Sequence, residues 1–118
     1  MDLLVVRHGA AEDKDAFART GQDDDLRPLT PGGQKEMREV ARSLRELVPE
    51  IDTLATSPLV RAVQTAEILG NAYDREAVPV EWLRPEAPYE EFSRWAASHR
   101  DKKTTVIVGH EPHLSGLV

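Results

Sequence analysis

The chain has 118 residues, and its 15 Lys and Arg against 21 Asp and Glu give a formal net charge of −6 at pH 7. The length predicts a single domain over residues 1–118, and 40% apolar with 31% charged residues is a soluble globular composition. An acidic chain argues against nucleic-acid binding, and the absence of cysteine excludes disulfides, thiolate catalysis and cysteine-bound zinc. The apolar run at residues 3–6 is too short for a signal peptide or a membrane span, so we expect a cytoplasmic protein without a membrane partner.

The first half of the chain predicts a strand, a loop and a helix. Residues 3–6 are apolar and rich in β-branched side chains, which predicts a buried strand. Residues 10–29 are polar and irregular and predict a surface loop with one helical turn. Thr30 followed by proline predicts a helix start, because threonine caps backbone donors and proline is tolerated at the first helical position. Apolar residues at helical spacing then continue to residue 48, and Pro49 ends the helix.

The rest of the chain alternates in the same way. The predicted elements are a strand at 51–56, a helix at 58–73, a weaker strand at 78–82, a helix at 89–99, a strand at 104–108 and the first turns of a helix at 114–118. Pro79 places the weaker strand at an edge of the sheet. Strands alternating with helices predict an α/β fold with a largely parallel sheet.

Polar side chains follow three of the four predicted strands. Arg7 and His8 follow the first, Ser57 follows the second with Arg61 one helical turn further, and His110 follows the fourth. In a parallel sheet these carboxyl ends meet at one edge, where ligands bind. A cationic cluster in an acidic protein indicates an anion, and phosphate fits best because a guanidinium binds two phosphate oxygens in a planar fork.

These segments carry a resemblance to a known family. Residues 7–9, 57–66 and 108–111 resemble the three signatures of the histidine phosphatase (phosphoglycerate mutase-like) superfamily. Within it, Arg-His-Gly-x-Ala at 7–11 and Arg-Pro-Leu-Thr-x-x-Gly at 27–33 resemble the SixA-type phosphohistidine phosphatases. The resemblance implies a three-layer α/β sandwich that lacks the usual C-terminal helix and strand, because SixA-type chains continue past the last signature.

The resemblance also implies roles for the matching residues. His8 would be the nucleophile that forms a phosphohistidine intermediate, with one ring nitrogen attacking and the other donating a hydrogen bond. His110 is expected to be protonated when phosphate is bound. The residues expected to hold the phosphoryl group are Arg7, Arg61 and His110, with Gly9 and Ser57 as further substrate-binding residues. No metal and no cofactor are implied.

The general acid departs from the superfamily pattern. Mutases and ester phosphatases carry Leu-x-Glu after the third strand, where this chain has Pro85 in place of the Glu and Glu86 one residue later. An ester leaving group needs a proton, whereas the P–N bond of phosphohistidine is more labile. The sequence therefore favours phosphohistidine on a partner protein as the substrate. Glu86 is the candidate acid, with Glu12 and Glu111 as alternatives.

Two other functions stay open at this stage. One is hydrolysis of a small phosphomonoester or pyrophosphate with Glu86 as the acid. The other is a module that binds phosphate or a phosphoprotein without turnover. The identity of the phosphodonor and the oligomeric state also stay open.

Simpler structural interpretations apply to several conspicuous residues. Ser57 is expected to cap the following helix rather than to act as a nucleophile. The acidic run at 23–25 is expected to be a solvated loop, and the aromatic residues at 89, 92 and 95 are expected to pack in the core. His110 and His113 have helical spacing, but the sequence offers no third ligand for a zinc site.

Overall fold

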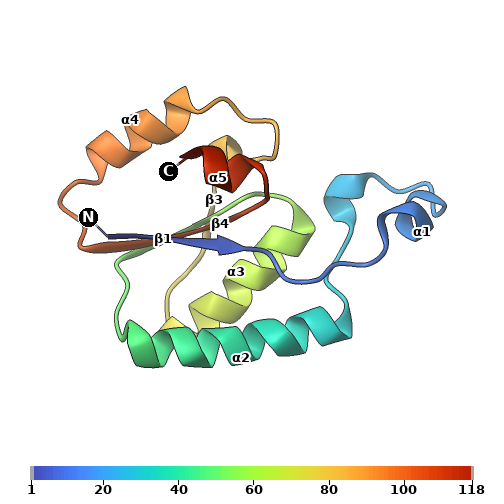
Figure 1. Ribbon diagram of the computed structural model, residues 1–118, viewed down its shortest axis with the longest axis horizontal. Coiled ribbons are helices and arrows are strands. Elements are labelled where there is room, and N and C mark those ends of the chain that lie inside the picture. Colours follow the sequence, from blue (N-terminus) through green and yellow to red (C-terminus); the bar gives the residue numbers. More distant parts are fainter. Residues whose placement is uncertain (1, 118) are drawn as a thin grey trace.

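A sheet of four parallel strands lies at the centre of the molecule, in a computed structural model that describes residues 2–117 (Figure 1). The strands are β1 (Asp2–Arg7), β2 (Thr53–Thr56), β3 (Val78–Pro79) and β4 (Thr104–Gly109). Their order is β1-β4-β2-β3, and each pair of neighbours is parallel. The predicted α/β class with a largely parallel sheet is confirmed.

Helices cover both faces of the sheet. They are α1 (Lys14–Ala18), α2 (Pro31–Leu47), α3 (Val60–Tyr73), α4 (Glu90–Ser98) and α5 (His113–Leu117), with 3₁₀ turns η1 (Asp24–Leu26) and η2 (Glu81–Leu83). α2 and α3 lie against one face, and α4 and α5 lie on the other (Figure 1). The expected three-layer sandwich is therefore confirmed. The last predicted helix is α5 up to Leu117, and Val118 lies outside the described residues.

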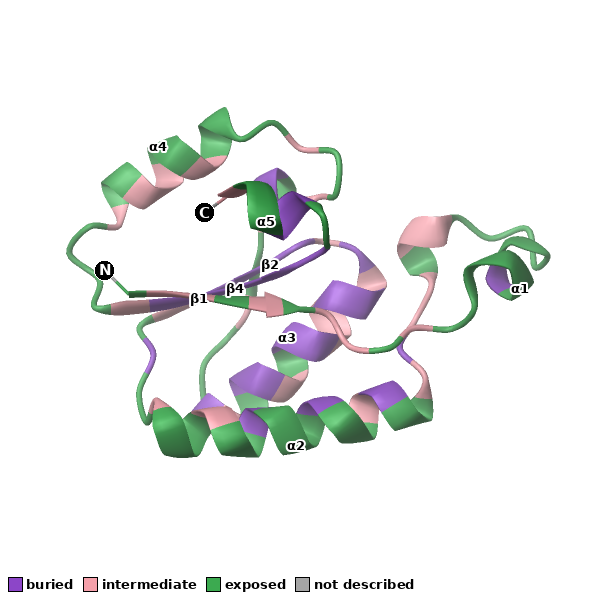
Figure 2. Cartoon of the chain, in the orientation of Figure 1, coloured by how far each residue is buried: buried purple, intermediate pink, exposed green. Residues whose placement is uncertain are grey.

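Each face of the sheet carries its own apolar cluster. Leu54 and Val106 pack with α2 and α3, whereas Ala55 and Ile107 pack on the side of α4 and α5. Neighbouring residues face opposite ways because side chains alternate along a strand. The central strands are accordingly buried on both sides, as Figure 2 shows.

β1 forms one edge of the sheet. It pairs with β4, and its exposure varies along the strand, with Val5 39% exposed. The prediction of a buried strand at residues 3–6 is therefore wrong in its burial, although the strand itself is present. An apolar run of four residues does not distinguish a central strand from an edge strand that is covered on its two faces.

The predicted strand at 78–82 is also corrected. Val78 and Pro79 pair with β2 at the opposite edge, which confirms the edge position. Val80 then leads into η2, so Trp82 lies in a 3₁₀ turn rather than in an extended strand, and its side chain is buried. Val80 N still donates to Thr56 O at 2.8 Å, and the strand ends there because the chain turns into η2 at Glu81.

The structure tests the two helix starts that the sequence predicts, at Thr30 and at Pro58. Thr30 caps α2 as predicted, since its hydroxyl accepts a hydrogen bond from Gly33 N at 2.9 Å. α3 begins at Val60 rather than at Pro58, and no side chain caps it. Threonine directly before a proline-initiated helix is thus the more reliable of the two signals.

The aromatic residues of the α4 region divide between core and surface. Phe92 and Trp95 pack against Trp82, with ring centroids 5.4 and 5.0 Å apart, as expected for core residues. Tyr89 is 46% exposed and stacks on His113, so its assignment to the core is wrong. Tyr89 precedes the first turn of α4, where the sheet does not cover it.

Residues 10–29 leave the carboxyl end of β1 as an excursion that contains α1 and η1 (Figure 1). The expected single helical turn is therefore a short helix and a 3₁₀ turn. A backbone bridge between Ala11 and Leu29 closes the base of the excursion. Leu29 N also donates to Gln64 Oε1 at 2.7 Å, which ties the excursion to α3. The segment is thereby held beside the ends of the strands.

Candidate active site

The carboxyl ends of β1, β4 and β2 meet, as the sequence predicts. Arg7 is paired with Gly109 in register, and His8 N donates to Gly109 O at 3.1 Å. Ser57 N donates to Val108 O at 2.9 Å. Backbone pairing therefore fixes the starting points of the three segments that carry the candidate residues.

An open cavity of about 880 Å³ lies at this edge. Its lining includes Arg7, His8, Gly9, Arg27, Arg61 and His110, together with Glu36, Pro85 and Glu111. A volume of this size is in the range of pockets that hold ligands far larger than phosphate. The cavity thus has room for the group that carries the phosphate as well as for the phosphate itself.

His8 is half-buried, and the backbone carbonyl of the next residue, Gly9, determines which ring nitrogen carries the hydrogen. Its Nδ1 lies 2.7 Å from Gly9 O, and because a carbonyl only accepts, Nδ1 carries the hydrogen. Nε2 therefore keeps its lone pair. Burial lowers the pKa of His8, and the nearby Arg61 and Arg7 lower it further. At neutral pH the ring is an uncharged nucleophile.

Close packing holds the loop that carries His8. A Cβ at Gly9 would lie 2.6 Å from Met37 Cγ, and a Cβ at Gly33 would lie 2.1 Å from Ala10 O. The start of α2 therefore packs directly against the loop backbone. Gly9 N donates to Thr65 Oγ1 at 3.1 Å, which joins the loop to α3. Thr65 is a site residue that the sequence did not single out, although it lies inside a recognised motif.

Arg61 projects from the first turn of α3, and its side chain is only 7% exposed. Nη1 donates to Asp24 O at 2.9 Å, and Nη2 lies 3.4 Å from Asp24 Oδ2. Within the described residues, its buried Nε has no hydrogen-bond partner. A buried guanidinium with an unsatisfied N–H, at the wall of a cavity, is suited to receive an oxyanion.

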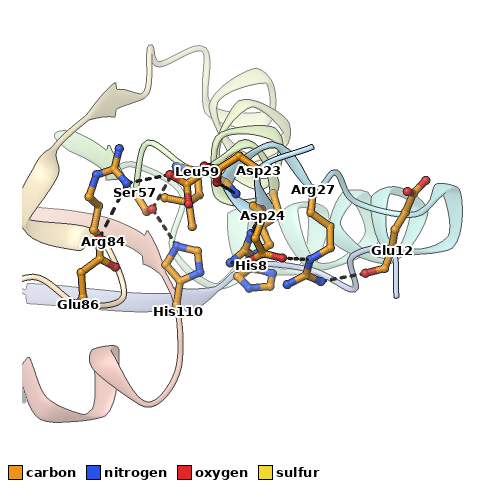
Figure 3. Close-up of polar contacts among 12 residues, drawn as sticks. His8, Glu12, Asp23, Asp24, Arg27, Ser57, Leu59, Arg84, Glu86 and His110 are labelled. Carbon is orange, nitrogen blue, oxygen red and sulfur yellow. Dashed lines mark hydrogen bonds and ion pairs between the residues drawn. The ribbon is translucent and has the colours of Figure 1, made fainter. Parts of the chain in front are cut away.

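Arg27 adds a third arginine that the sequence did not assign to the site. Its Nε contacts Asp24 Oδ1 at 2.9 Å and its Nη1 donates to Glu12 O at 2.8 Å (Figure 3). It lines the same cavity as His8. Arg27 comes from the 10–29 excursion rather than from a strand end, so only the folding of that segment brings it to the site.

The acidic run in the excursion is not simply solvated, so that expectation is corrected. Asp24 pairs with Arg27 and Arg61, and Asp25 Oδ2 lies 3.1 Å from Arg84 Nη1. The hydrogen bond from Arg27, together with the positive charges of Arg27 and Arg61, lowers the pKa of Asp24. These two carboxyl groups therefore pair with arginines at and beside the cavity.

His110 is buried beside His8, with ring centroids 5.0 Å apart. Its Nε2 lies 2.8 Å from Ser57 Oγ (Figure 3). Burial, with smaller contributions from His8 and Arg61, lowers the pKa of His110 to about 3. His110 is therefore neutral in the ligand-free protein, and the expected protonation with phosphate bound stays a prediction.

Ser57 does not cap α3, which corrects that expectation. The N-cap position belongs to Leu59, and Ser57 Oγ accepts from Leu59 N at 3.3 Å in the preceding turn. Its hydroxyl instead pairs with His110, and Ser57 is fully buried. Ser57 thus connects the end of β2 to the end of β4, and it is not among the residues that line the cavity.

The candidate acids occupy different places. Glu86 is exposed, pairs with Arg84 at 4.0 Å and is not among the residues that line the cavity (Figure 3). Pro85 lines the cavity in its stead. Glu12 contributes its backbone carbonyl to Arg27, whereas Glu111 lines the cavity and accepts a hydrogen bond from Ser115.

Residues 2–117 contain no group of three His, Cys, Asp or Glu side chains placed to hold a metal ion. His113, the partner considered for a zinc pair, has its Nε2 3.0 Å from Ala87 O. Over the same described range, no helix has the length and apolar character needed to cross a membrane.

Fold and site together define an α/β protein in which two histidines and three arginines line one cavity at the carboxyl edge of a parallel sheet. The family model of the histidine phosphatase superfamily (branch 1) matches residues 3–87, and the chain belongs to this superfamily.

Curated relatives include both mutases and phosphatases. An uncharacterized protein of Picosynechococcus is 38% identical over 119 residues, which cover 97% of this chain and 68% of that protein. A 2,3-bisphosphoglycerate-dependent phosphoglycerate mutase of Treponema pallidum is 40% identical over 80 residues, 68% of this chain and 31% of the mutase. Phosphohistidine phosphatase SixA of Escherichia coli is 37% identical over 71 residues, 60% of this chain and 40% of SixA. The segments that match thus span less than half the length of these two named enzymes.

Among solved structures, the protein histidine phosphatase SixA in complex with tungstate superposes with a TM-score of 0.84 at 28% identity. The match covers 99% of this chain and 74% of that chain. The sequence and fold similarities together support a SixA-type assignment within the superfamily.

Proposed function

We propose that this protein is a phosphatase that removes the phosphoryl group of phosphohistidine, carried on a partner protein, through a covalent intermediate on His8. Superfamily membership and the SixA relatives support the phosphatase class. The observation that carries the proposal is the hydrogen bond from His8 Nδ1 to Gly9 O, which leaves Nε2 unprotonated in a cavity lined by arginines.

Phosphoryl transfer at this site takes two steps. The Nε2 lone pair of His8 forms a bond to phosphorus while the P–N bond of the substrate breaks, and the leaving ring takes up a proton from solvent and departs as neutral imidazole. Water then attacks phosphorus, the bond to Nε2 breaks, and phosphate departs with the remaining water proton going to phosphate or solvent. Arg7 and Arg61 stabilise charge on the equatorial oxygens in both steps.

The placement of carboxylates supports phosphohistidine over stable esters. Pro85 lines the cavity where mutases and ester phosphatases carry their Glu, and Glu86 is turned to Arg84 outside it. An alkoxide leaving group without a positioned acid loses about 10²–10⁴-fold in rate. An imidazole leaving group tolerates that loss better because its ring nitrogen accepts a proton from solvent.

Ester hydrolysis is the second candidate, and one observation favours it. Glu36 and Glu111 also line the cavity, and either carboxyl group would supply the proton that an ester needs. Comparison of phosphoramidate with phosphoserine, an alkyl ester whose leaving group needs a proton, distinguishes the two reactions. We expect kcat/KM on phosphoramidate to exceed that on the ester and to change less than about twofold in Glu86→Gln, since that residue lies outside the cavity. Equal activity on both substrates, lost in Glu111→Gln, would establish the ester reaction.

Covalent trapping tests the intermediate. After incubation with phosphoramidate, mass spectrometry of the wild-type protein is expected to find an acid-labile, base-stable phosphoryl group on His8. The His8→Ala variant should carry none. The chain has four histidines, so His99→Ala, at the C-cap of α4, is the matched control and should label like the wild type. Absence of an adduct with every P–N and P–O donor tried would favour a module that binds phosphate without turnover.

A further inference from the structure

Asp24 holds two cationic side chains of the cavity at once. Its Oδ1 lies 2.9 Å from Arg27 Nε and its Oδ2 lies 3.4 Å from Arg61 Nη2. Its backbone carbonyl accepts a hydrogen bond from Arg61 Nη1 at 2.9 Å. One residue in a 3₁₀ turn is therefore the shared partner of Arg61 from α3 and of Arg27 from the excursion, and Figure 3 draws the contact with Arg27.

The two arginines need such a partner because they repel each other. Burial lowers the pKa of Arg61, the positive charge of Arg27 lowers it further, and the carboxylate of Asp24 raises it. Two guanidiniums that face one cavity are stable side by side only when a negative charge or an anion lies between or beside them. Asp24 supplies that charge before any substrate arrives.

The contacts with Asp24 do not use all the hydrogen-bond donors of Arg61. Nη1 and Nη2 are directed to Asp24, but Nε is buried and has no hydrogen-bond partner within residues 2–117. Asp24 is itself held in place: Asp23 caps its turn by accepting from Asp25 N at 2.9 Å, and Asp25 pairs with Arg84. The arrangement fixes the direction of Arg61 without satisfying all of its donors.

We propose that Asp24 is a positioning residue, which bridges Arg27 and Arg61 and sets the direction in which Arg61 presents its donors to the phosphoryl group. The inference rests on the proposed function for its reaction, but the bridge itself is a property of the folded protein. Asp24 does not touch the reacting atoms and acts through the two arginines. Charge alone binds a ground-state anion, whereas the transition state requires aligned donors.

The first experiment measures how mobile the side chains of Arg27 and Arg61 are, and it needs no enzymatic turnover. Nitrogen relaxation of the Nε–H groups, recorded by NMR, is expected to find Arg27 and Arg61 rigid in the wild type and mobile in Asp24→Asn. Asp23→Asn removes the same charge one residue earlier while keeping a side-chain oxygen for the cap, so it is the matched control and should leave both arginines rigid. Unchanged order of both arginines in Asp24→Asn overturns the proposal.

The second experiment separates positioning from a general loss of structure. In Asp24→Asn, kcat on phosphoramidate is expected to fall at least about tenfold, while the dissociation constant of tungstate, measured by calorimetry at pH 7.5, stays level or falls because a negative charge has been removed. Parallel losses of kcat and tungstate affinity would indicate a structural role. A rise in kcat would indicate that Asp24 blocks the site. Either result contradicts the proposal.

Misfolding of the variant and inactivity of the wild type have their own tests. If Asp24→Asn does not fold, Asp24→Glu decides, since it keeps the charge but moves it by one methylene group. A lower kcat at unchanged tungstate affinity then supports the bridge, and an unchanged kcat overturns it. If the wild type turns over neither phosphoramidate nor phosphoserine, the proposed function fails, and the NMR comparison still decides whether Asp24 positions the arginines.

Discussion

Ser57 Oγ lies 2.8 Å from Nε2 of His110, and this contact joins the ends of the two neighbouring strands β2 and β4. Both residues are buried, and the His110 ring is 5.0 Å from that of His8. The serine therefore orients a histidine that lines the cavity together with His8.

Replacement of Ser57 by alanine should weaken the site more than the fold. The variant leaves His110 Nε2 without its partner, so we expect kcat to fall about tenfold and the free energy of unfolding to fall by about 1 kcal/mol. Urea unfolding and phosphoramidate kinetics measure the two effects. Ser98 also pairs with a histidine, at 2.9 Å from His99 Nδ1, but on the surface of α4. Ser98→Ala is thus the control, and an equal loss of kcat there would contradict the role of Ser57.

Replacement by alanine should destabilise the protein at Gly9, in the loop after β1, and stabilise it at Gly32, in the first turn of α2. A Cβ at Gly9 would lie 2.6 Å from Met37 Cγ, so Gly9→Ala is expected to cost about 1–3 kcal/mol and to lower kcat by moving the acceptor of His8 Nδ1. At Gly32 the nearest atom is 3.9 Å away, so Gly32→Ala should stabilise the helix by about 0.5–1 kcal/mol. Thermal unfolding compares the pair, and a stable Gly9→Ala would contradict the close packing.

The free energy of unfolding should decrease as the pH is lowered, over a range set by the pKa of His110. Its pKa is about 3 in the folded chain and about 6.5 in an unfolded chain. Between these values the unfolded state binds a proton that the folded state does not, so the free energy of unfolding decreases as the pH falls from about 6.5 toward 3. The slope from this group is at most about 1.4 kcal/mol per pH unit. Urea unfolding at pH 7 and pH 5 should find a smaller difference in His110→Gln than in the wild type, and equal differences would contradict the assignment.

Anion binding should be coupled to proton uptake. A dianion beside His110 favours the imidazolium form, so its pKa is expected to rise when the cavity is occupied. Sulfate is a suitable probe because it has no titrating proton near pH 5.5. Calorimetry in two buffers with different ionisation enthalpies measures the protons taken up, which should be fewer in His110→Gln. Zero uptake by the wild type would mean that His110 stays neutral with the anion bound.

The sequence alone predicted the parts of the fold that depend on local pattern. The β-branched runs that end at Arg7 and Gly109, the alternation of strands with helices and the Thr30 cap are all present. Because parallel strands end at one edge, the meeting of His8, His110 and Arg61 also followed from sequence order. Local pattern did not predict that β1 is an edge strand or that the chain leaves the sheet after Val80, since burial and strand length depend on neighbours distant in the chain.

Only the tertiary structure decided the electrostatic details of the site. Arg27 and Asp24 lie in an irregular excursion, and their contacts with Arg61 depend on how that segment folds back over α3. Ser57 was assigned to a helix cap because its partner, His110, is 53 residues away in the chain. The sequence determined which strand ends carry Arg7, His8 and His110, because these residues directly follow the predicted strands in the chain. The neutral His110, the tautomer of His8 and the carboxylate between two arginines were decided by burial and by contacts between distant segments.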